Sequence, residues 1–371
     1  MNWPVIMICC VCISIVLTLI IIPQIIHLSL AKRLFDKPDN RKIHHGIVPR
    51  LGGLAFMPVM LITCGIMLAI LQRCGAYSPG LGMADYGSEL SDILILFASM
   101  TVLFMTGMAD DLLDLKYMHK FVAQALSALI IVGAGLAITD YSNLFGIGET
   151  TRLGGEIITF LLIIFILNAI NLIDGIDGLA SGMSLISLVI YSVMLYMEGR
   201  YLFCTLGWIG VGTTLVFWIF NVCGSRRKHT KIFMGDIGSL SIGLLLAFMV
   251  ISVVSAGEKS ASPIEGDLLL VVLSPLVIPI FDVVRVFFDR LIHKSSPFMP
   301  DKRHIHHKML ASGMSQYLAL AVLLLAQVAI IAVNIYLENY LGINMILVID
   351  VLIYMFVFLL PGLRRQKKAT P

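Results

Sequence analysis

Long apolar runs alternate with short polar segments along almost the whole chain. A helix needs roughly 20 mostly apolar residues to cross the hydrocarbon core of a bilayer. The pattern therefore predicts an all-α, polytopic integral membrane protein with one transmembrane domain over residues 1–371. We expect about eleven transmembrane helices, near residues 3–30, 52–73, 91–109, 120–138, 156–172, 178–197, 201–221, 238–256, 267–287, 316–337 and 342–363.

Composition supports a protein that lies in the lipid bilayer. The chain is 58% hydrophobic and 13% charged, whereas soluble domains carry about 25% charged residues. We expect no nucleic-acid partner. No Lys or Arg precedes the first apolar run, which is longer than the apolar core of a cleavable signal peptide. Cys9 and Cys12 have CxxC spacing but lie within this run, where packing is favoured over zinc binding.

Basic residues gather on one side of the predicted helices. Of the 26 lysines and arginines, all but Arg73, Arg152, Arg200 and Lys259 fall in the loops after odd-numbered helices or in the tail. Cytoplasmic loops carry the excess of positive charge in membrane proteins. The sequence therefore predicts that the N-terminus lies outside, the C-terminus inside, and these basic loops at the cytoplasmic face.

Aspartates gather in the same basic loops. Asp110, Asp111 and Asp114 stand where the third predicted helix leaves the membrane. If the helix continues, Asp114 lies four positions after Asp110 and three after Asp111, so all three share one face. Carboxylates this close repel one another unless a cation lies among them or one is protonated. The pattern favours a cation or phosphate site, with an ordinary solvated helix end as the alternative.

Two further polar motifs lie at helix ends on this side. Asn168, Asn171, Asp174 and Asp177 recur at every third position at the end of an apolar run. Polar groups at membrane depth usually line a functional cavity, although Asn can also join two helices. Asp236 lies in a Gly-flanked turn before the eighth helix, where backbone N–H groups favour anions. Carboxylate and amide oxygens suit Mg²⁺.

Basic and histidine-rich segments occupy the first and last large loops of this side. Arg303, His304, His306 and His307 follow Lys302 in the last loop. Their spacing matches no common zinc site, so we favour contacts with a diphosphate over zinc binding. The first loop, residues 31–51, is also basic and contains His44, His45 and Arg50. Contact with anionic lipid is the alternative for the last loop. The first loop could order a lipid phosphate at the membrane surface, with a plain positive-inside anchor as the alternative.

The order of these motifs resembles one enzyme family. Asp-Asp-x-x-Asp (110–114), Asn-x-x-Asn-x-x-Asp-Gly-x-Asp-Gly (168–178), Met-Gly-Asp-x-Gly-Ser (234–239) and the histidine segment resemble the polyprenyl-phosphate N-acetylhexosamine-1-phosphate transferases (glycosyltransferase family 4). Pro-Arg-Leu-Gly-Gly (49–53) and Arg-His-Ile-His-His (303–307) look like the bacterial undecaprenyl-phosphate GlcNAc-1-phosphate branch. The phospho-MurNAc-pentapeptide branch carries Thr-Met-Gly-Gly and three adjacent histidines, which this chain lacks.

The resemblance implies a Mg²⁺-dependent transfer, with Mn²⁺ as a substitute, of a sugar phosphate from UDP-GlcNAc to undecaprenyl phosphate. This step would initiate a cell-envelope polysaccharide such as O-antigen at the bacterial inner membrane. The implied metal ligands are Asn171 and Asp236. The implied catalytic residues are Asp110, Asp111, Asp114 and His304. The implied substrate-binding residues are Asp174, Asp177, Lys120, Lys116, Arg50, Arg303, His306, His307 and Asn168.

Other functions remain open from the sequence. The same chemistry could use UDP-FucNAc or UDP-QuiNAc, because a few contacts set the choice of sugar, or could transfer phospho-MurNAc-pentapeptide. An ion or solute transporter should carry ionisable residues at mid-membrane and paired broken helices. Here most charges lie at one interface, and Asp282 in the ninth predicted helix is expected to pair with Arg285 as a structural ion pair. A homodimer is compatible with the sequence.

Overall fold

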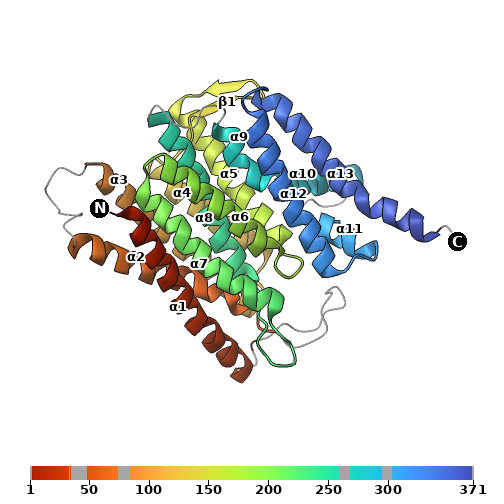
Figure 1. Ribbon diagram of the computed structural model, residues 1–371, viewed down its shortest axis with the longest axis horizontal. Coiled ribbons are helices and arrows are strands. Elements are labelled where there is room, and N and C mark those ends of the chain that lie inside the picture. Colours follow the sequence, from red (N-terminus) through yellow and green to blue (C-terminus); the bar gives the residue numbers. More distant parts are fainter. Residues whose placement is uncertain are drawn as a thin grey trace.

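The computed structural model describes residues 2–32, 34, 48–73, 84–259, 268–294 and 303–369. These residues are helical apart from one short hairpin (Figure 1). The α-helices are α1 (Trp3–Ala31), α2 (Phe56–Arg73), α3 (Ala84–Leu113), α4 (Tyr117–Gly133), α5 (Arg152–Ile173), α6 (Leu179–Met197), α7 (Tyr201–Cys223), α8 (Gly235–Lys259), α9 (Leu268–Leu273), α10 (Val277–Ile292), α11 (Ile305–Ala311), α12 (Gln316–Leu337) and α13 (Ile343–Ala369). The 3₁₀ helices are η1 (Leu51–Ala55) and η2 (Ser274–Leu276), and the strands are β1 (Asp140–Leu144) and β2 (Ile147–Glu149).

The structure confirms an all-α, multi-pass membrane protein but with fewer full-length spans than predicted. Among the described residues, nine helices are long and apolar enough to cross a membrane. Two predicted spans correspond to shorter apolar helices, α4 and the Ile343–Leu359 part of α13. Helix α4 ends before residue 138 because Gly135 takes a left-handed conformation with φ +92°. The orientation in the membrane stays a prediction.

Helix α8 lies at the centre of the bundle. The apolar stretch Gly235–Ser255 is buried apart from Gly235, Asp236 and Ser255, which are partly buried, and α8 packs against α3, α5 and α6. A helix that is apolar on all sides is stable in such a position because it has no polar face to solvate. This packing fixes the N-terminal turn of α8, which contains Asp236, between the ends of the surrounding helices (Figure 1).

The ninth predicted span is broken rather than continuous. Pro275 interrupts it within η2, between α9 and α10. Such a break frees backbone carbonyls, which must find partners at membrane depth. Tyr191 Oη donates to the Val272 carbonyl at 2.8 Å, and Gln327 Nε2 donates to the Pro275 carbonyl at 2.8 Å. Polar side chains of α6 and α12 therefore stabilise the break.

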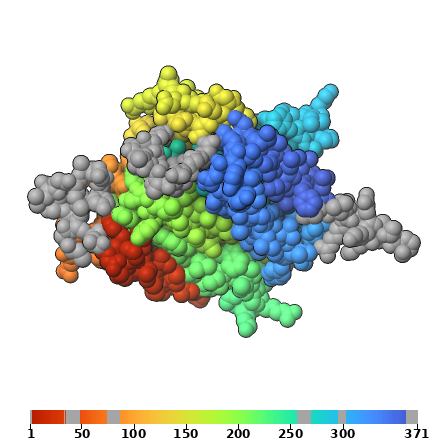
Figure 2. Space-filling view, turned by 45° about the horizontal axis from the view of Figure 1, so that its top comes forward, coloured from red at the N-terminus to blue at the C-terminus, as the bar shows by residue number. Residues whose placement is uncertain are grey.

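The β hairpin was not predicted from the sequence. Its strands pair antiparallel between α4 and α5, and Asn344 bonds to its turn through the Phe145 N–H and the Asn143 carbonyl, at 2.8 and 2.9 Å. In Figure 2 the hairpin region (yellow) lies on the surface beside the C-terminal helices (blue). The hairpin thus joins the middle of the chain to the start of α13, away from the helix ends that carry the aspartate motifs.

Candidate active site

Segments far apart in the sequence meet around the start of α8. The chain before η1 pairs with the chain before α8: Phe233 N–H donates to the Pro49 carbonyl at 2.8 Å, and Gly52 N–H to the Phe233 carbonyl at 3.0 Å. Gly53 N–H donates to the Met234 carbonyl at 2.9 Å. The end of the first basic loop therefore lies against the segment that leads into Asp236.

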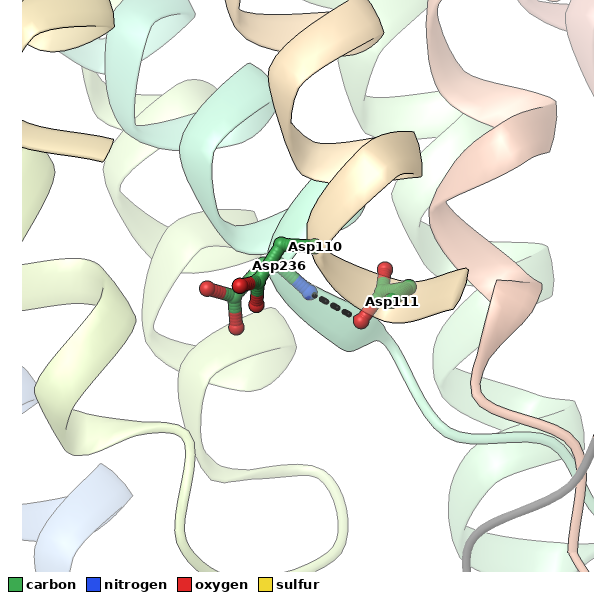
Figure 3. A group of neighbouring side chains, drawn as sticks. All are labelled: Asp110, Asp111 and Asp236. Atoms are coloured by element: carbon green, nitrogen blue, oxygen red, sulfur yellow. Dashed lines mark hydrogen bonds between the residues drawn. The ribbon is translucent and has the colours of Figure 1, made fainter. Parts of the chain in front are cut away.

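Three carboxylates from two helices converge at this point (Figure 3). Asp110 and Asp111 come from the last turn of α3, and Asp236 comes from the first turn of α8. One ligand oxygen of each lies within 4.8 Å of the others. Asp110 is buried, and the other two are partly buried. Like charges this close are stabilised by a cation among them or by a proton on one of them, so the cluster is a candidate cation site.

Asp111 also caps helix α8. Its carboxylate accepts the Asp236 N–H at 3.1 Å and the Ile237 N–H at 3.2 Å, and Figure 3 draws the first of these bonds. These two donors are among the N–H groups that a helix start leaves without intrahelical partners. Gly235 precedes them with φ +70°, a conformation that glycine adopts without steric cost. The sequence predicted an anion at this helix start, and in the structure the Asp111 carboxylate takes that place.

Lys120 of α4 supplies a positive charge between two of the carboxylates. Its Nζ lies 2.6 Å from Asp110 Oδ2 and 2.7 Å from Asp236 Oδ2. Asp110 Oδ1 meanwhile accepts the Leu115 N–H at 2.9 Å, which closes the turn after α3. The sequence suggested Lys120 as a phosphate contact; the structure shows it paired with carboxylates. The position of the Lys120 ammonium group shows that a positive charge is stable between α3, α4 and α8.

The third acidic residue of the Asp-Asp-x-x-Asp motif does not share the expected face. Helix α3 ends at Leu113, and Asp114 has φ +50° and is exposed. The expectation of a helical continuation that aligns Asp110, Asp111 and Asp114 is therefore wrong, because the left-handed turn redirects the chain. Lys116, in the same turn, is also exposed. Roles for Asp114 and Lys116 stay predictions.

The two asparagines of α5 have different surroundings. Asn171 Nδ2 donates to Ser239 Oγ at 2.8 Å, and its side chain lies close enough to interact with the Asp236 carboxylate. Asn168 instead pairs with Gln124 of α4 at 2.8 Å and with the Ile164 carbonyl. Asn171 thus lies beside the carboxylate cluster, whereas Asn168 joins two helices, which is the alternative that the sequence left open.

The turn after α5 brings two more aspartates toward the cluster. Desolvation by the surrounding protein raises the pKa of Asp174 to about 7, and repulsion from Asp236 and Asp177 adds to the shift, although the Asp174 side chain itself is exposed. Asp177 is buried and forms an ion pair with buried Lys231 at 2.5 Å. This pairing satisfies Asp177 within the protein, and Asp174 is the member of the turn that is accessible to a ligand.

The histidine segment lies against the same turn. The His306 ring packs on Gly175, where an added Cβ would collide with it. His306 is 1% exposed, and neither ring nitrogen has a hydrogen-bond partner among the described residues. His304 stacks on His306 with ring centroids 5.9 Å apart. The structure therefore brings residues 174–178 and 304–306 together, although they are more than a hundred positions apart.

The remaining candidates lie around this core. Arg303 pairs with Asp289 of α10 at 2.8 Å and is about one-third exposed. The His307 ring lies 4.3 Å from that of His306. Arg50 is partly buried, and its charge acts on Asp174 in opposition to the neighbouring carboxylates. Lys302, His44 and His45 lie outside the described residues.

Comparisons with known proteins place the chain in a family. A family model described as glycosyl transferase family 4 matches residues 93–254, which include Asp110, Asp111 and Asp236. A Bacillus subtilis (strain 168) protein named a probable undecaprenyl-phosphate N-acetylglucosaminyl 1-phosphate transferase is 30% identical over 315 residues, covering 84% of this chain and 80% of its own. The chain belongs to glycosyl transferase family 4. It is therefore a transferase of that family, as the motifs suggested.

Two other relatives of this family 4 enzyme carry a closely similar name. The undecaprenyl-phosphate alpha-N-acetylglucosaminyl 1-phosphate transferase of Salmonella typhimurium is 28% identical over 305 residues, which cover 81% of this chain and 76% of the relative. The Escherichia coli (strain K12) protein of the same name is 26% identical over 307 residues, with the same coverage, 81% and 76%. The similarity thus extends well beyond the segment that the family model matches.

Sequence reasoning missed several residues that build the candidate site. Lys231 forms an ion pair with Asp177. The Asn221 side chain accepts a hydrogen bond from the Gly178 N–H, and Ser239 accepts one from Asn171. Asp282 was set aside as a partner of Arg285. That ion pair exists at 2.7 Å, but Asp282 also binds His304. The signal for Asp282 was available, because a charge inside a span usually has a function.

Gly175→Ala should disturb the candidate site through His306. The new Cβ would overlap the imidazole ring, so either the ring or the 174–178 turn must move. We expect a loss of about 1–3 kcal/mol of stability, the usual cost of overpacking, together with reduced turnover. Gly65→Ala is the control because no atom lies within 4 Å of its added Cβ. Equal melting temperatures and rates for the two variants would contradict the prediction.

Acid sensitivity should depend on His306. Burial, together with the charge of His307, lowers its pKa to about 3. The unfolded chain binds this proton below about pH 6.5 and the native state does not, so the free energy of unfolding falls as the pH drops. Between pH 7.5 and pH 5 the loss is about 2 kcal/mol. The melting temperature of His306→Gln should therefore fall less over this range.

His119→Gln serves as the control for the acid-sensitivity measurement, because His119 is an exposed histidine of α4. It should keep the wild-type dependence of melting temperature on pH. If His306→Gln loses as many degrees between pH 7.5 and pH 5 as the wild type, the prediction is wrong.

Proposed function

We propose that this transferase moves GlcNAc-1-phosphate from UDP-GlcNAc to undecaprenyl phosphate and releases UMP. One structural observation carries the proposal: Asp110 and Asp111 of α3 meet Asp236 of α8 beside Lys120. Carboxylates and a cation in this arrangement suit a reaction between two phosphorylated substrates. The names of the three relatives support undecaprenyl phosphate and GlcNAc as the substrates.

The residues of the cluster fit a magnesium ion. Three carboxylates and the Asn171 amide supply the oxygen ligands that Mg²⁺ prefers. Lys120 shows that positive charge between Asp110 and Asp236 is favourable. Asp110, Asp111, Asp236 and Asn171 would hold the ion, with Mn²⁺ as a substitute. A bound ion would neutralise charge on the phosphates of the substrates.

The proposed reaction needs alignment and charge stabilisation more than proton transfer. An oxygen of the lipid phosphate bonds to the β-phosphorus of UDP-GlcNAc, and the bond from that phosphorus to the bridging oxygen breaks, so UMP leaves. A phosphate monoester is largely dianionic at pH 7, so Asp110 need not act as a base. Lys120 would align the acceptor phosphate, while Arg303 and His304 would contact the diphosphate.

The position of the cluster suits a lipid substrate. Asp110 ends one spanning helix and Asp236 begins another, so both lie where a span meets the membrane surface. A lipid phosphate at that surface would reach them while its chain stays in the bilayer. We place this site at the cytoplasmic face of the bacterial inner membrane, because the basic loops lie at the same helix ends. The whole chain would then form one catalytic unit.

A donor panel tests the proposed function. Purified protein in detergent, with undecaprenyl phosphate and Mg²⁺, is given labelled UDP-GlcNAc, UDP-FucNAc, UDP-QuiNAc or UDP-MurNAc-pentapeptide in separate reactions. We expect a lipid-linked product and stoichiometric UMP with UDP-GlcNAc, and no product after EDTA treatment until Mg²⁺ is restored. Turnover with another donor alone would reject GlcNAc, and solute flux in proteoliposomes without turnover would reject the transferase.

A further inference from the structure

Asp282 of α10 is completely buried, and its carboxylate accepts four hydrogen bonds. Its Oδ1 accepts Arg285 Nη2 at 2.7 Å, the Ile305 N–H at 3.0 Å and Tyr354 Oη at 3.0 Å. Its Oδ2 accepts His304 Nδ1 at 2.7 Å. Each carboxylate oxygen has two acceptor positions, so Oδ1 is fully used, and at 0% exposure neither oxygen is accessible to a substrate or a metal ion. Asp282 therefore acts on the site only through the groups that it holds.

The bond from His304 determines which ring nitrogen faces outward. A carboxylate on Nδ1 keeps a proton there, so Nε2 of the neutral ring is an acceptor. His304 is 4% exposed, and no described residue hydrogen-bonds its Nε2. The ring stacks on His306, which packs on Gly175 in the turn between Asp174 and Asp177. Asp282 thus sets the orientation of the His304 ring through Nδ1, while the face of the ring packs on His306.

The C-terminal helix completes this arrangement. Tyr354 of α13 donates to Asp282 and accepts Arg285 Nε at 3.1 Å. Arg285 also donates to the Arg303 carbonyl at 2.7 Å, and its guanidinium lies over the Phe358 ring at 4.4 Å. Helices α10 and α13 thereby hold Arg303 and Ile305, the residues before and after His304. Figure 1 shows α13 beside α10, α11 and α12. Helix α13 lies outside the segment 93–254 that the family model matches.

We propose that Asp282, supported by Tyr354 of the C-terminal helix, is a positioning residue that fixes the tautomer and orientation of His304 for the sugar nucleotide. The proposal rests on the proposed function, in which His304 contacts the diphosphate. Residues that orient a functional histidine through its second nitrogen typically contribute 10–100-fold to activity. Asp282→Asn keeps the shape of the side chain but can present an N–H to Nδ1, which would favour the wrong tautomer.

A double-mutant cycle in the purified full-length protein separates positioning from a general structural role. We expect Asp282→Asn to lower kcat/KM by about 10–100-fold and Tyr354→Phe to lower it several-fold. In a His304→Gln background, each of these substitutions should lower kcat/KM by less than about a further threefold, because the effects of coupled residues are not additive. Asp350→Asn, which alters another buried aspartate on α13, should stay within about threefold of wild type in both backgrounds.

If Asp282→Asn and Tyr354→Phe lower kcat/KM by the same factor in the His304→Gln background as in the wild type, the positioning role is wrong. Melting temperatures establish that each variant is folded, and Tyr354→Phe decides the question if Asp282→Asn does not insert. The NMR spectrum of ¹⁵N-histidine-labelled protein gives a readout that does not need turnover. The signal that disappears in His304→Gln is assigned to His304. Asp282→Asn should move that signal away from the Nδ1–H form, and an unchanged signal would also overturn the proposal. An inactive wild type with an Asp282-dependent signal would reject only the proposed function.

Discussion

Asp236→Ala should reduce kcat/KM on the order of 10³-fold, since the charge stabilisation that a metal ion supplies is worth several kcal/mol. Asp236 is the only member of the carboxylate cluster that α8 contributes, it pairs with Lys120, and it lies beside Asn171 as well as the proposed ion. Its removal therefore separates three groups at once. The measurement is lipid-linked product formation from labelled UDP-GlcNAc over a range of Mg²⁺ concentrations.

Asp140→Asn is the matched control for Asp236→Ala, because Asp140 lies in the hairpin at the opposite end of α4 from Lys120. It should retain wild-type turnover. High Mg²⁺ should restore little activity to Asp236→Ala, because the ligand itself is missing. Turnover near the wild-type rate at low Mg²⁺, in a variant that inserts normally, would show that Asp236 does not hold the ion.

Lys120→Met should lower kcat on the order of 10²-fold, the usual cost of removing one preorganised group that stabilises charge. It should also lower the Mg²⁺ concentration at half-maximal activity. In the structure the ammonium pairs with Asp110 and Asp236, so it competes with a metal ion for the same oxygens. Its removal frees these ligands while the acceptor phosphate loses a contact. Rates measured against Mg²⁺ concentration show both effects.

Two further variants make the Lys120 result specific. Lys120→Arg keeps the charge and should recover part of the lost rate. Lys228→Met removes an exposed lysine between α7 and α8 and should leave both the rate and the Mg²⁺ dependence unchanged. A higher Mg²⁺ requirement in Lys120→Met would mean that the lysine assists metal binding rather than opposing it.

The sequence predicted the membrane class and the main chemistry for clear physical reasons. Helix formation in a bilayer depends on local apolar length, so most spans were predicted to within a few residues. α4 was an exception because Gly135 ends it early. Acidic residues at helix ends are conspicuous against an apolar background, and Asp110, Asp111 and Asp236 do meet in space. Asp114 does not follow them, because a single left-handed residue redirects the chain.

The sequence by itself determined that this chain is a multi-pass helical membrane protein with carboxylates and cations at its helix ends, because hydropathy and charge are properties of local segments. Only the tertiary structure decided which of these groups meet. It placed Lys120 between Asp110 and Asp236, paired Lys231 with Asp177, and joined Asp282 to His304. Such pairings depend on how helices pack, and packing is set by contacts between residues far apart in the chain, which no local pattern contains.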